Sequence, residues 1–333
     1  MNWSSGYSVS YYMTRLDPIT LRDVERIEIT GGSIKREAEG LRESATIDCT
    51  DYPNIVEQWV RVWLDTEQSG SSSHIPLFTG LATSPARDFK GEYETNSIEC
   101  YSVLKPASDV YLLRGWYAPA GMSGASVIKE LLSVIPAPVS VADNSPTLQN
   151  HIIAEESETR LTMIEKILTA INWRLIIKGD GIVRVEPKPI DPVATFDPIE
   201  NDVIETQIKV SEDWFSCPNV LMAIDNELMA IARDDSEKSQ LSTVNRGREV
   251  WQQETSCDLA DNETIEQYAF RRLKELQKTE KTASYDRRFM PDVYPSDIVR
   301  LHYPAQGLDG NFTVRSQSID LGYAARTSEE IIK

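Results

Sequence analysis

The residue types best suited to acid–base or metal chemistry are few in this chain and widely separated. Histidine occurs three times in 333 residues, at His74, His151 and His302, and there is no His-Glu-x-x-His motif. A zinc hydrolase needs at least two such ligands at a fixed spacing. The four cysteines lie about 40 or more residues apart and form no Cys-x-x-Cys pair: Cys49, Cys100, Cys217 and Cys257. The sequence therefore predicts no metal site, and it favours buried, reduced thiols in a chain that folds in a cytosol.

Two other kinds of catalytic group stay open from sequence alone. A glycosidase needs only two carboxylates at the right separation, and 52 Asp and Glu residues supply many pairs, none of which stands out. Cys217, next to Pro218, is a candidate nucleophile, although a core thiol is the commoner role. The run Gly179-Asp180-Gly181 is followed by strand-like sequence rather than a helix, so it is no nucleotide-binding loop. We expect no enzyme, no catalytic or cofactor-binding residue and no cofactor.

Aromatic side chains offer a third kind of chemistry, the stacking of sugars. On a strand, Trp59, Arg61 and Trp63 share one face, which is either a carbohydrate-binding ledge or a surface that packs a sheet against a neighbour. The packing role is the commoner one, and in an oligomer the neighbour is another subunit. Trp116-Tyr117 is open in the same way between core and contact.

Charge restricts the class of partner. The net charge is −18, of which −6 falls in residues 1–108, −1 in residues 109–190 and −11 in residues 191–333. Phosphate binding needs clustered Lys and Arg, so a protein that grips DNA is disfavoured. An acidic surface that DNA passes without adsorbing is compatible with this charge, as is simple solubility. No apolar run approaches the roughly 20 residues of a membrane span, and the N-terminus does not look like a signal peptide.

The elements that would position these residues fall into three predicted domains. Residues 1–108 contain short alternating strands and turn signals, which favour a sandwich or barrel. Residues 109–190 carry two amphipathic helices, with Ser123 and Thr159 as predicted N-caps. A hairpin with Gly-Asp-Gly at its tip follows, with Trp173, Leu175 and Ile177 on one face of its first strand.

Residues 191–333 return to strand after a proline-rich stretch, Pro187 to Pro198, which predicts a stiff linker. Val220 to Arg233 predicts a hairpin turning at Asp225-Asn226. Asn262 is the predicted cap of a helix with acids at its start (Asp261, Glu263, Glu266) and bases near its end (Arg271, Arg272, Lys274, Lys278). Three closing strands are expected, at Ile298 to Tyr303, Phe312 to Ile319 and Ser328 to Lys333, with a turn at Leu308-Asp309-Gly310 before the second.

Several segments together resemble the baseplate hub proteins of contractile phage tails, the prophage-type and Mu-type hubs akin to late control protein D. The segments are Tyr11-Tyr12-Met13 with Leu16-Asp17-Pro18-Ile19-Thr20, Ile27 to Arg36, Leu77 to Pro85, Ile164 to Val185, and Asp297-Ile298-Val299 with Gly307 to Ser316. Each motif alone is weak, whereas their order and spacing cover nearly the whole chain.

The resemblance implies a β-rich α+β fold in which two tail-tube-like β-barrel domains, residues 1–108 and 191–333, flank a small helix-plus-hairpin domain, residues 109–190. It implies a homotrimer that adapts a sixfold tail tube to a threefold central spike and lines the channel for DNA. The implied partners are the tube protein, the spike protein and wedge or other baseplate proteins. The implied location is the tail baseplate of a virion or tailocin particle, assembled in the host cytoplasm. A tail-associated cell-wall hydrolase and a carbohydrate-binding adhesin module are the alternatives.

Overall fold

The computed structural model describes residues 2–3, 5–49, 57–90, 93–199, 203–212, 214–225, 228–255, 263–277 and 281–333. Strands make up 48% of it and helices 16%, which confirms the predicted β-rich α+β composition. The chain divides into two compact units: unit 1 is Met1–Ile208 with Ser284–Ile331, and unit 2 is Lys209–Ala283 with Ile332–Lys333. Five residues used above lie outside the described part: Asn226, Cys257, Asp261, Asn262 and Lys278.

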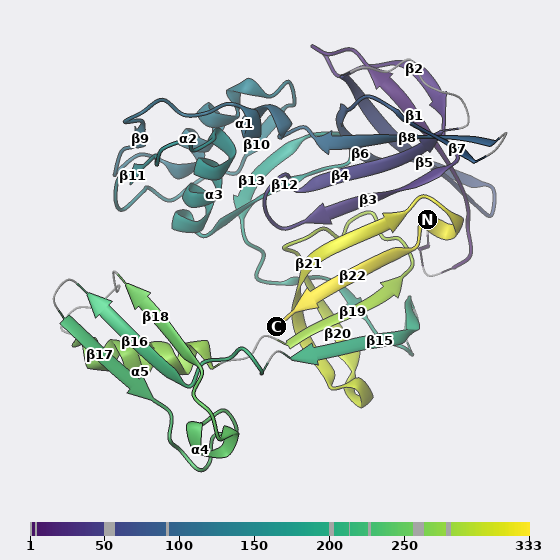
Figure 1. Ribbon diagram of the computed structural model, residues 1–333. Helices are drawn as coiled ribbons and strands as arrows, with labels where there is room; N and C mark the ends of the chain where they lie inside the picture. The colour runs from purple at the N-terminus through teal and green to yellow at the C-terminus, as the bar shows by residue number, and fades with distance from the viewer. Residues whose placement is uncertain are drawn as a thin grey trace. The chain divides into compact units, whose positions relative to one another are not determined.

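A large sheet dominates unit 1 (Figure 1). Its early strands are β1 (Ser8–Leu16), β2 (Asp23–Glu28), β3 (Gly31–Glu37), β4 (Glu43–Cys49), β5 (Gln58–Gln68), β6 (Ser71–Ala82), β7 (Ala86–Lys90) and β8 (Tyr93–Ser102). Its late strands are β14 (Pro192–Phe196), β15 (Ile204–Glu212), β19 (Lys281–Arg287), β20 (Ile298–Tyr303), β21 (Leu308–Asp320) and β22 (Thr327–Ile332). The order is β15-β19-β22-β21-β3-β4-β8-β6-β5-β1-β2, with β7 on β8, β20 on β21 and β14 on β20.

Early and late strands share this one sheet because β21 pairs with β3, from Ser316 opposite Glu37 to Asp320 opposite Ser33. In the described part of the chain, the main strand path is open and ends at β15 and β2. The β-rich part of the prediction is thus confirmed, whereas the two-barrel layout and the division at residues 108 and 190 stay predictions.

Alternation along the strands explains the core of this sheet. In β4, Ala45, Ile47 and Cys49 point inward and Thr46 and Asp48 alternate with them, as period two requires. Strands β5 and β6 form a hairpin that turns at Ser69-Gly70, because Gln68 and Ser71 close its ladder.

The helical part of unit 1 lies between the early and late strands in the sequence (Figure 1). Its elements are α1 (Lys105–Asp109), β9 (Tyr117–Ala118), α2 (Gly124–Leu131), η1 (Leu132–Val134), β10 (Val139–Val141), β11 (Ile152–Ile153), α3 (Arg160–Ile171), β12 (Trp173–Ile177) and β13 (Val183–Pro187). Both predicted caps are confirmed: Ser123 accepts from the Ser126 N–H, and Thr159 accepts from the Thr162 N–H. The predicted hairpin is β12–β13, whose outer neighbour is β10.

Two local predictions were wrong. The expected proline-rich linker contains β14, which pairs in parallel with β20; Pro192 stands at its first residue, where a missing N–H is tolerated. The run Leu308-Asp309-Gly310 lies inside β21 rather than in a turn. The reversal comes earlier, through η2 (Pro304–Gln306), and Gly307 with φ of 69° ends it. A further short helix, η3 (Tyr323–Ala325), joins β21 to β22.

Unit 2 is a three-stranded sheet with a helix on one face. Its elements are β16 (Val220–Asp225), β17 (Leu228–Arg233), α4 (Thr243–Arg246), β18 (Trp251–Thr255) and α5 (Ile265–Leu276), and the strand order is β17-β16-β18. The predicted hairpin and helix are confirmed, although the N-cap of α5 is Thr264, whose side chain and Gln267 form a capping box. The chain enters unit 2 from β15 and returns through β19, and these two strands are neighbours in the large sheet.

Candidate functional site

The histidines that could do acid–base chemistry lie apart from one another. His74 Nδ1 is 2.6 Å from Asp65 Oδ1, and His302 Nδ1 is 3.2 Å from Asp309 Oδ1. His151 Nδ1 accepts a hydrogen bond from a backbone N–H at 3.1 Å. Among the described residues, no three His, Cys, Asp or Glu side chains are grouped so that they could hold a metal ion. The same part of the chain contains no helix that is long and apolar enough to cross a bilayer.

Three of the cysteines are buried thiols, at positions 49, 100 and 217. Burial raises the pKa of Cys49 to about 11 and also raises the pKa of Cys100, so both are protonated at neutral pH. The thiol of Cys217 donates to the carbonyl of Leu276, 3.2 Å away, at the end of α5. These environments are those of core thiols rather than of activated nucleophiles.

The tryptophan strand β5 is built into the protein interior. Trp59 is 9% exposed and belongs to the hydrophobic core that includes the helices α2 and α3. Arg61 is 9% exposed as well, and its guanidinium donates to Thr79 Oγ1 at 3.0 Å and to the carbonyl of Asp180 at 3.0 Å. Neither side chain can therefore form part of an exposed sugar-binding ledge.

Trp63 is the half-buried member of the three. Its ring lies nearly parallel to that of Tyr12, with centroids 6.2 Å apart, and its indole N–H donates to Thr14 Oγ1 at 3.1 Å. The other ring already carries a guanidinium, since Arg26 lies 4.0 Å from the Tyr12 centroid. Of the second aromatic pair, Trp116 packs partly against the core, whereas Tyr117 is half exposed and contacts the His151 ring at 5.6 Å.

The Gly-Asp-Gly tip of the β12–β13 hairpin docks against β6. The carbonyl of Gly179 accepts from Thr79 Oγ1 at 2.7 Å, and the carbonyl of Asp180 accepts from Arg61. A Cβ at position 179 would lie 1.8 Å from the carbonyl oxygen of Pro76, so only glycine permits this approach. The tip is thus a plug that fixes the helical part of unit 1 to the early strands.

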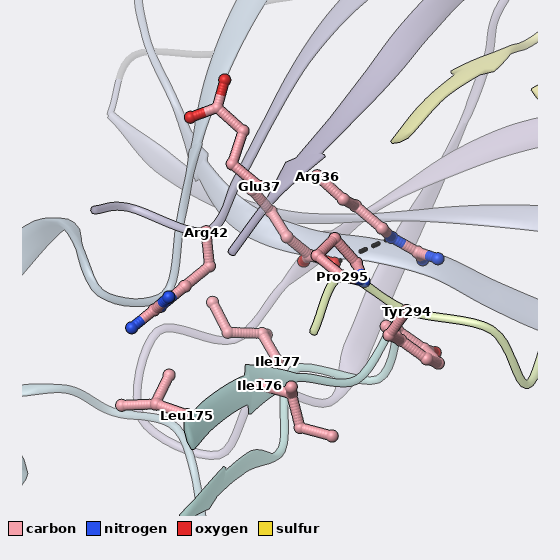
Figure 2. A pocket seen from close by; sticks show the side chains of 9 residues that line it. Arg36, Glu37, Arg42, Leu175, Ile176, Ile177, Tyr294 and Pro295 are labelled. Atoms are coloured by element: carbon pink, nitrogen blue, oxygen red, sulfur yellow. Dashed lines mark ion pairs between the residues drawn. The ribbon is translucent and has the colours of Figure 1, made fainter. Parts of the chain in front are cut away.

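A buried ionic junction lies near this plug, since both contact the backbone at Pro76 and Leu77. Figure 2 marks its ion pair with a dashed line. Arg36 and Glu43, on neighbouring strands β3 and β4, form an ion pair with 3.0 Å between Nε and Oε1, and both side chains are almost fully buried. The Arg36 guanidinium also donates to the carbonyl of Leu77 at 2.6 Å and lies 4.6 Å from the ring centroid of Tyr294. Burial raises the pKa of Glu43 to about 7, although Arg36 opposes the shift.

Tyr294 connects this junction to the hairpin and to the late strands. The ammonium of Lys178 lies 3.8 Å from its ring centroid, so the ring lies within reach of two cations. The backbone N–H of Tyr294 donates to Asp297 Oδ2 at 2.8 Å, and Asp297 Oδ1 pairs with Arg174 Nη1 at 2.6 Å. Arg174 also binds Glu186 across the hairpin at 2.6 Å. Three stretches that are distant in sequence therefore meet through charge.

The space at the junction is too small for a substrate. A small cavity there has a volume of about 10 Å³, which is about the room one water molecule needs. Figure 2 shows its lining, with β12 on one side and the Tyr294 loop on the other; the residues are Arg36, Glu37, Arg42, Glu43, Leu175, Ile176, Ile177, Tyr294 and Pro295. The arrangement positions strands and does not offer a reaction chamber.

A second buried network joins the late strands to one another. Glu329 accepts from Arg287 Nη2 at 2.6 Å, from Tyr285 Oη at 2.6 Å and from Gln317 Nε2 at 2.7 Å. All four residues are at most 3% exposed. Burial raises the pKa of Tyr285, which stays a hydrogen-bond donor.

Sequence reasoning missed these junction residues, although one signal was present. In β3, the inward positions are Ile34 and Arg36, so a charge occupies the core phase of a strand. A charged residue at such a position needs a buried partner of opposite charge. Glu43 is that partner, because the register of β3 and β4 puts it opposite Arg36. Asp297 and Tyr294 lie in a loop, where no periodicity announces their role.

Comparisons with known proteins bear on the fold. No family model matches the chain, and no curated protein matches it. Among solved structures, a tail protein from Neisseria meningitidis is similar with a TM-score of 0.67 at 16% identity, covering 99% of this chain and 97% of that one. The 43 kDa tail protein of prophage MuSo2 from Shewanella oneidensis gives a TM-score of 0.65 at 12% identity, covering 97% of each chain.

A third similar structure is a chain of the Francisella PdpA–VgrG complex. Its TM-score is 0.60 at 7% identity, and the match covers 98% of this chain and 58% of the other. The chain therefore has the fold of phage tail proteins, and the predicted resemblance to that group is confirmed at the level of structure.

Proposed function

We propose that this chain is a structural component of a phage-type tail, the hub of a contractile-tail baseplate, with no enzymatic activity. The observation that carries the proposal is the correspondence with two prophage or tail proteins over at least 97% of both lengths. A shared common domain would match over part of each chain only. Correspondence over whole chains supports a shared architecture and, by analogy of fold, a shared role.

The proposed layout is that of the sequence prediction: tube-like domains at residues 1–108 and 191–333, and a connecting helical domain at residues 109–190. Three copies would then present six similar domains, which matches a sixfold tube above and a threefold spike below. The open end of the described strand path at β15 supports this layout, because an exposed edge strand can pair with a neighbouring copy in an assembly.

The proposed partners are the tail tube protein, the central spike protein and wedge or other baseplate proteins. Similarity to a chain of the PdpA–VgrG complex supports a place next to a spike. The net charge of −18 suits a channel wall along which DNA slides, because like charges repel phosphates. The proposed location is the tail baseplate of a virion or tailocin particle, assembled in the host cytoplasm.

The mass of the purified chain in solution tests the proposal. Multi-angle light scattering should give about three times the chain mass of 37.6 kDa, and negative-stain electron microscopy should show a ring with a central channel. A monomeric mass at micromolar concentration, with no ring, would contradict the hub.

A separate assay addresses the hydrolase alternative. Peptidoglycan incubated with the full-length protein should release no soluble fragments. Release that one Asp or Glu substitution abolishes would replace the structural role with a catalytic one.

A further inference from the structure

One face of the unit 2 sheet is packed against a helix, and the other is largely exposed. Helix α5 covers the side formed by Leu221, Ala223, Ala230 and Ala232, which share a core with the buried side of the helix. The pairing register brings Met222, Ile224 and the fully buried Val220 of the middle strand to the opposite side. Met229 and Ile231 of β17 and Trp251, Gln253 and Thr255 of β18 share that side. We call this surface the outer face; its residues are Met222, Ile224, Met229, Ile231 and Trp251.

The five apolar side chains of the outer face are in contact with solvent, and the uncharged polar residues Gln253 and Thr255 lie beside them on β18. Met229 is 60% exposed, Trp251 50% and Ile231 49%, while Met222 and Ile224 in the middle strand are half-buried. In a sheet with one side in water, the outward positions are normally polar. Its charged neighbours are at the margin, where Arg233 pairs with Asp235 and with Glu249.

The edge strand β17 adds an exposed backbone to this apolar face. Among the described strands, β17 pairs with β16 alone, so its other edge is unpaired. Natural edge strands are usually guarded by charges, prolines or bulges. The sequence of β17, Leu-Met-Ala-Ile-Ala-Arg, has one charge, at its last residue, and its register with β16 is regular.

The size and composition of the outer face indicate its occupant. Its five side chains offer on the order of 300–400 Å² of apolar area, which is about the size of the largest apolar patch on a typical monomer, and such a patch is often functional. An interface that holds two proteins by itself buries about 800 Å² on each partner, so this face serves as one contact within a larger assembly. Interfaces whose centre carries no charged residue are typical of permanent contacts between copies of one chain. Interfaces with transient partners have about the polarity of the remaining surface.

We propose that the outer face is a contact surface between copies of this chain. The inference rests on the proposed homotrimer and deepens it by naming one of the surfaces that join its subunits. In a cyclic trimer each contact joins two different surfaces, so the outer face meets a different part of the neighbouring copy.

A charge-insertion variant of the full-length chain tests this surface. The double substitution Met229→Glu and Ile231→Glu places two carboxylates in the contact without partners, and it should raise the dissociation constant of the oligomer by at least about tenfold. The matched control is Phe270→Glu, on the outer side of α5, where the side chain is 52% exposed and lies away from the outer face. Sedimentation over a dilution series measures all three proteins, and circular dichroism checks that each is folded.

Each result bears on a different proposal. A trimeric wild type and control with a dissociated double variant support the contact surface. A double variant that stays trimeric with an unchanged dissociation constant overturns the contact surface and leaves the hub intact. A Phe270→Glu control that dissociates as much as the double variant has the same meaning. A monomeric wild type overturns the hub itself. If the acidic variant does not fold, the milder Met229→Ser and Ile231→Thr pair is held to the same criterion, because threonine and serine keep the strand while removing apolar area.

Discussion

The ionic junction of unit 1 and the outer face of unit 2 are opposites in burial: the first buries charged side chains, and the second exposes apolar ones. Arg36 and Glu43 are charged and almost fully buried, whereas Met229 and Trp251 are apolar and at least half exposed. The two buried charges are paired with each other inside one chain. The apolar side chains of the outer face find no such cover within unit 2. The comparison separates what one chain stabilises from what an assembly would have to stabilise.

Two edge strands repeat the contrast at smaller scale. In β2, four of six residues are charged: Asp23, Glu25, Arg26 and Glu28. A charged edge strand disfavours pairing with a strand of another chain. In β17, one of six is charged. The large sheet therefore ends in a guarded strand, and the small sheet ends in an open one.

The largest effect is expected at the second buried network. Replacing Glu329 with Leu removes the acceptor shared by Arg287, Tyr285 and Gln317 and leaves a buried guanidinium without its counter-charge. The free energy of unfolding should fall by about 3–5 kcal/mol. Urea denaturation measures it. The double variant Glu329→Leu with Arg287→Met should regain a large part of the loss, and a single variant as stable as the wild type would show that charge does not hold this region.

The plug at the hairpin tip should respond next most strongly. Gly179→Ala forces a methyl group against the carbonyl of Pro76, so the hairpin must withdraw from β6. Overpacking of this kind costs about 1–3 kcal/mol of unfolding free energy. The matched control is Gly6→Ala, where the added methyl meets nothing within 4 Å. Equal thermal unfolding of the two variants would mean that the tip is not docked in solution.

The ionic junction should make stability depend on pH. The folded-state pKa of Glu43 is about 7, above the ordinary 4.5, so the folded protein holds this proton more tightly than the unfolded chain. The resulting stabilisation is fully present below about pH 4.5 and is lost as the pH rises through about 7. Glu43→Gln should remove this part of the pH dependence, on the order of 1–2 kcal/mol between about pH 5 and about pH 8. Glu37→Gln, at an exposed neighbouring carboxylate, should keep the wild-type slope in denaturation curves.

The smallest effect is expected on the outer face. At high dilution, where copies are apart, Met229→Gln should change the free energy of unfolding by less than about 0.5 kcal/mol, because its side chain is 60% exposed. A loss of more than about 1 kcal/mol in the same denaturation assay would mean that the outer face is covered within one chain, and the comparison with the junction would fail.

Much of the fold follows from local pattern, and the functional geometry does not. Helices α2 and α3 were predictable from apolar spacing and from the caps Ser123 and Thr159, and the β12–β13 hairpin from alternation and its Gly-Asp-Gly tip. These signals act over a few residues. The pairing of β21 with β3 joins residues nearly 300 positions apart, and no local pattern fixes such a register.

The same limit applies to the surfaces that we propose matter. Trp59 and Arg61 were candidates for an exposed ledge because alternation shows which residues share a face and not whether that face is covered. The strand Leu228–Arg233 was predicted, but its bare outer side depends on α5 covering the other side, which is a tertiary fact. Prediction of contact surfaces therefore needs coordinates where prediction of helices does not.

The way unit 2 is attached has a consequence for engineering and for descent. Its entry strand β15 and its exit strand β19 are adjacent ladder partners, so a short reverse turn could in principle link them directly. A domain inserted between two neighbouring strands can be removed or exchanged without changing the strand order of the rest of the chain. Related chains could thus gain, lose or exchange unit 2 as a single insertion, together with the contact surface that it carries.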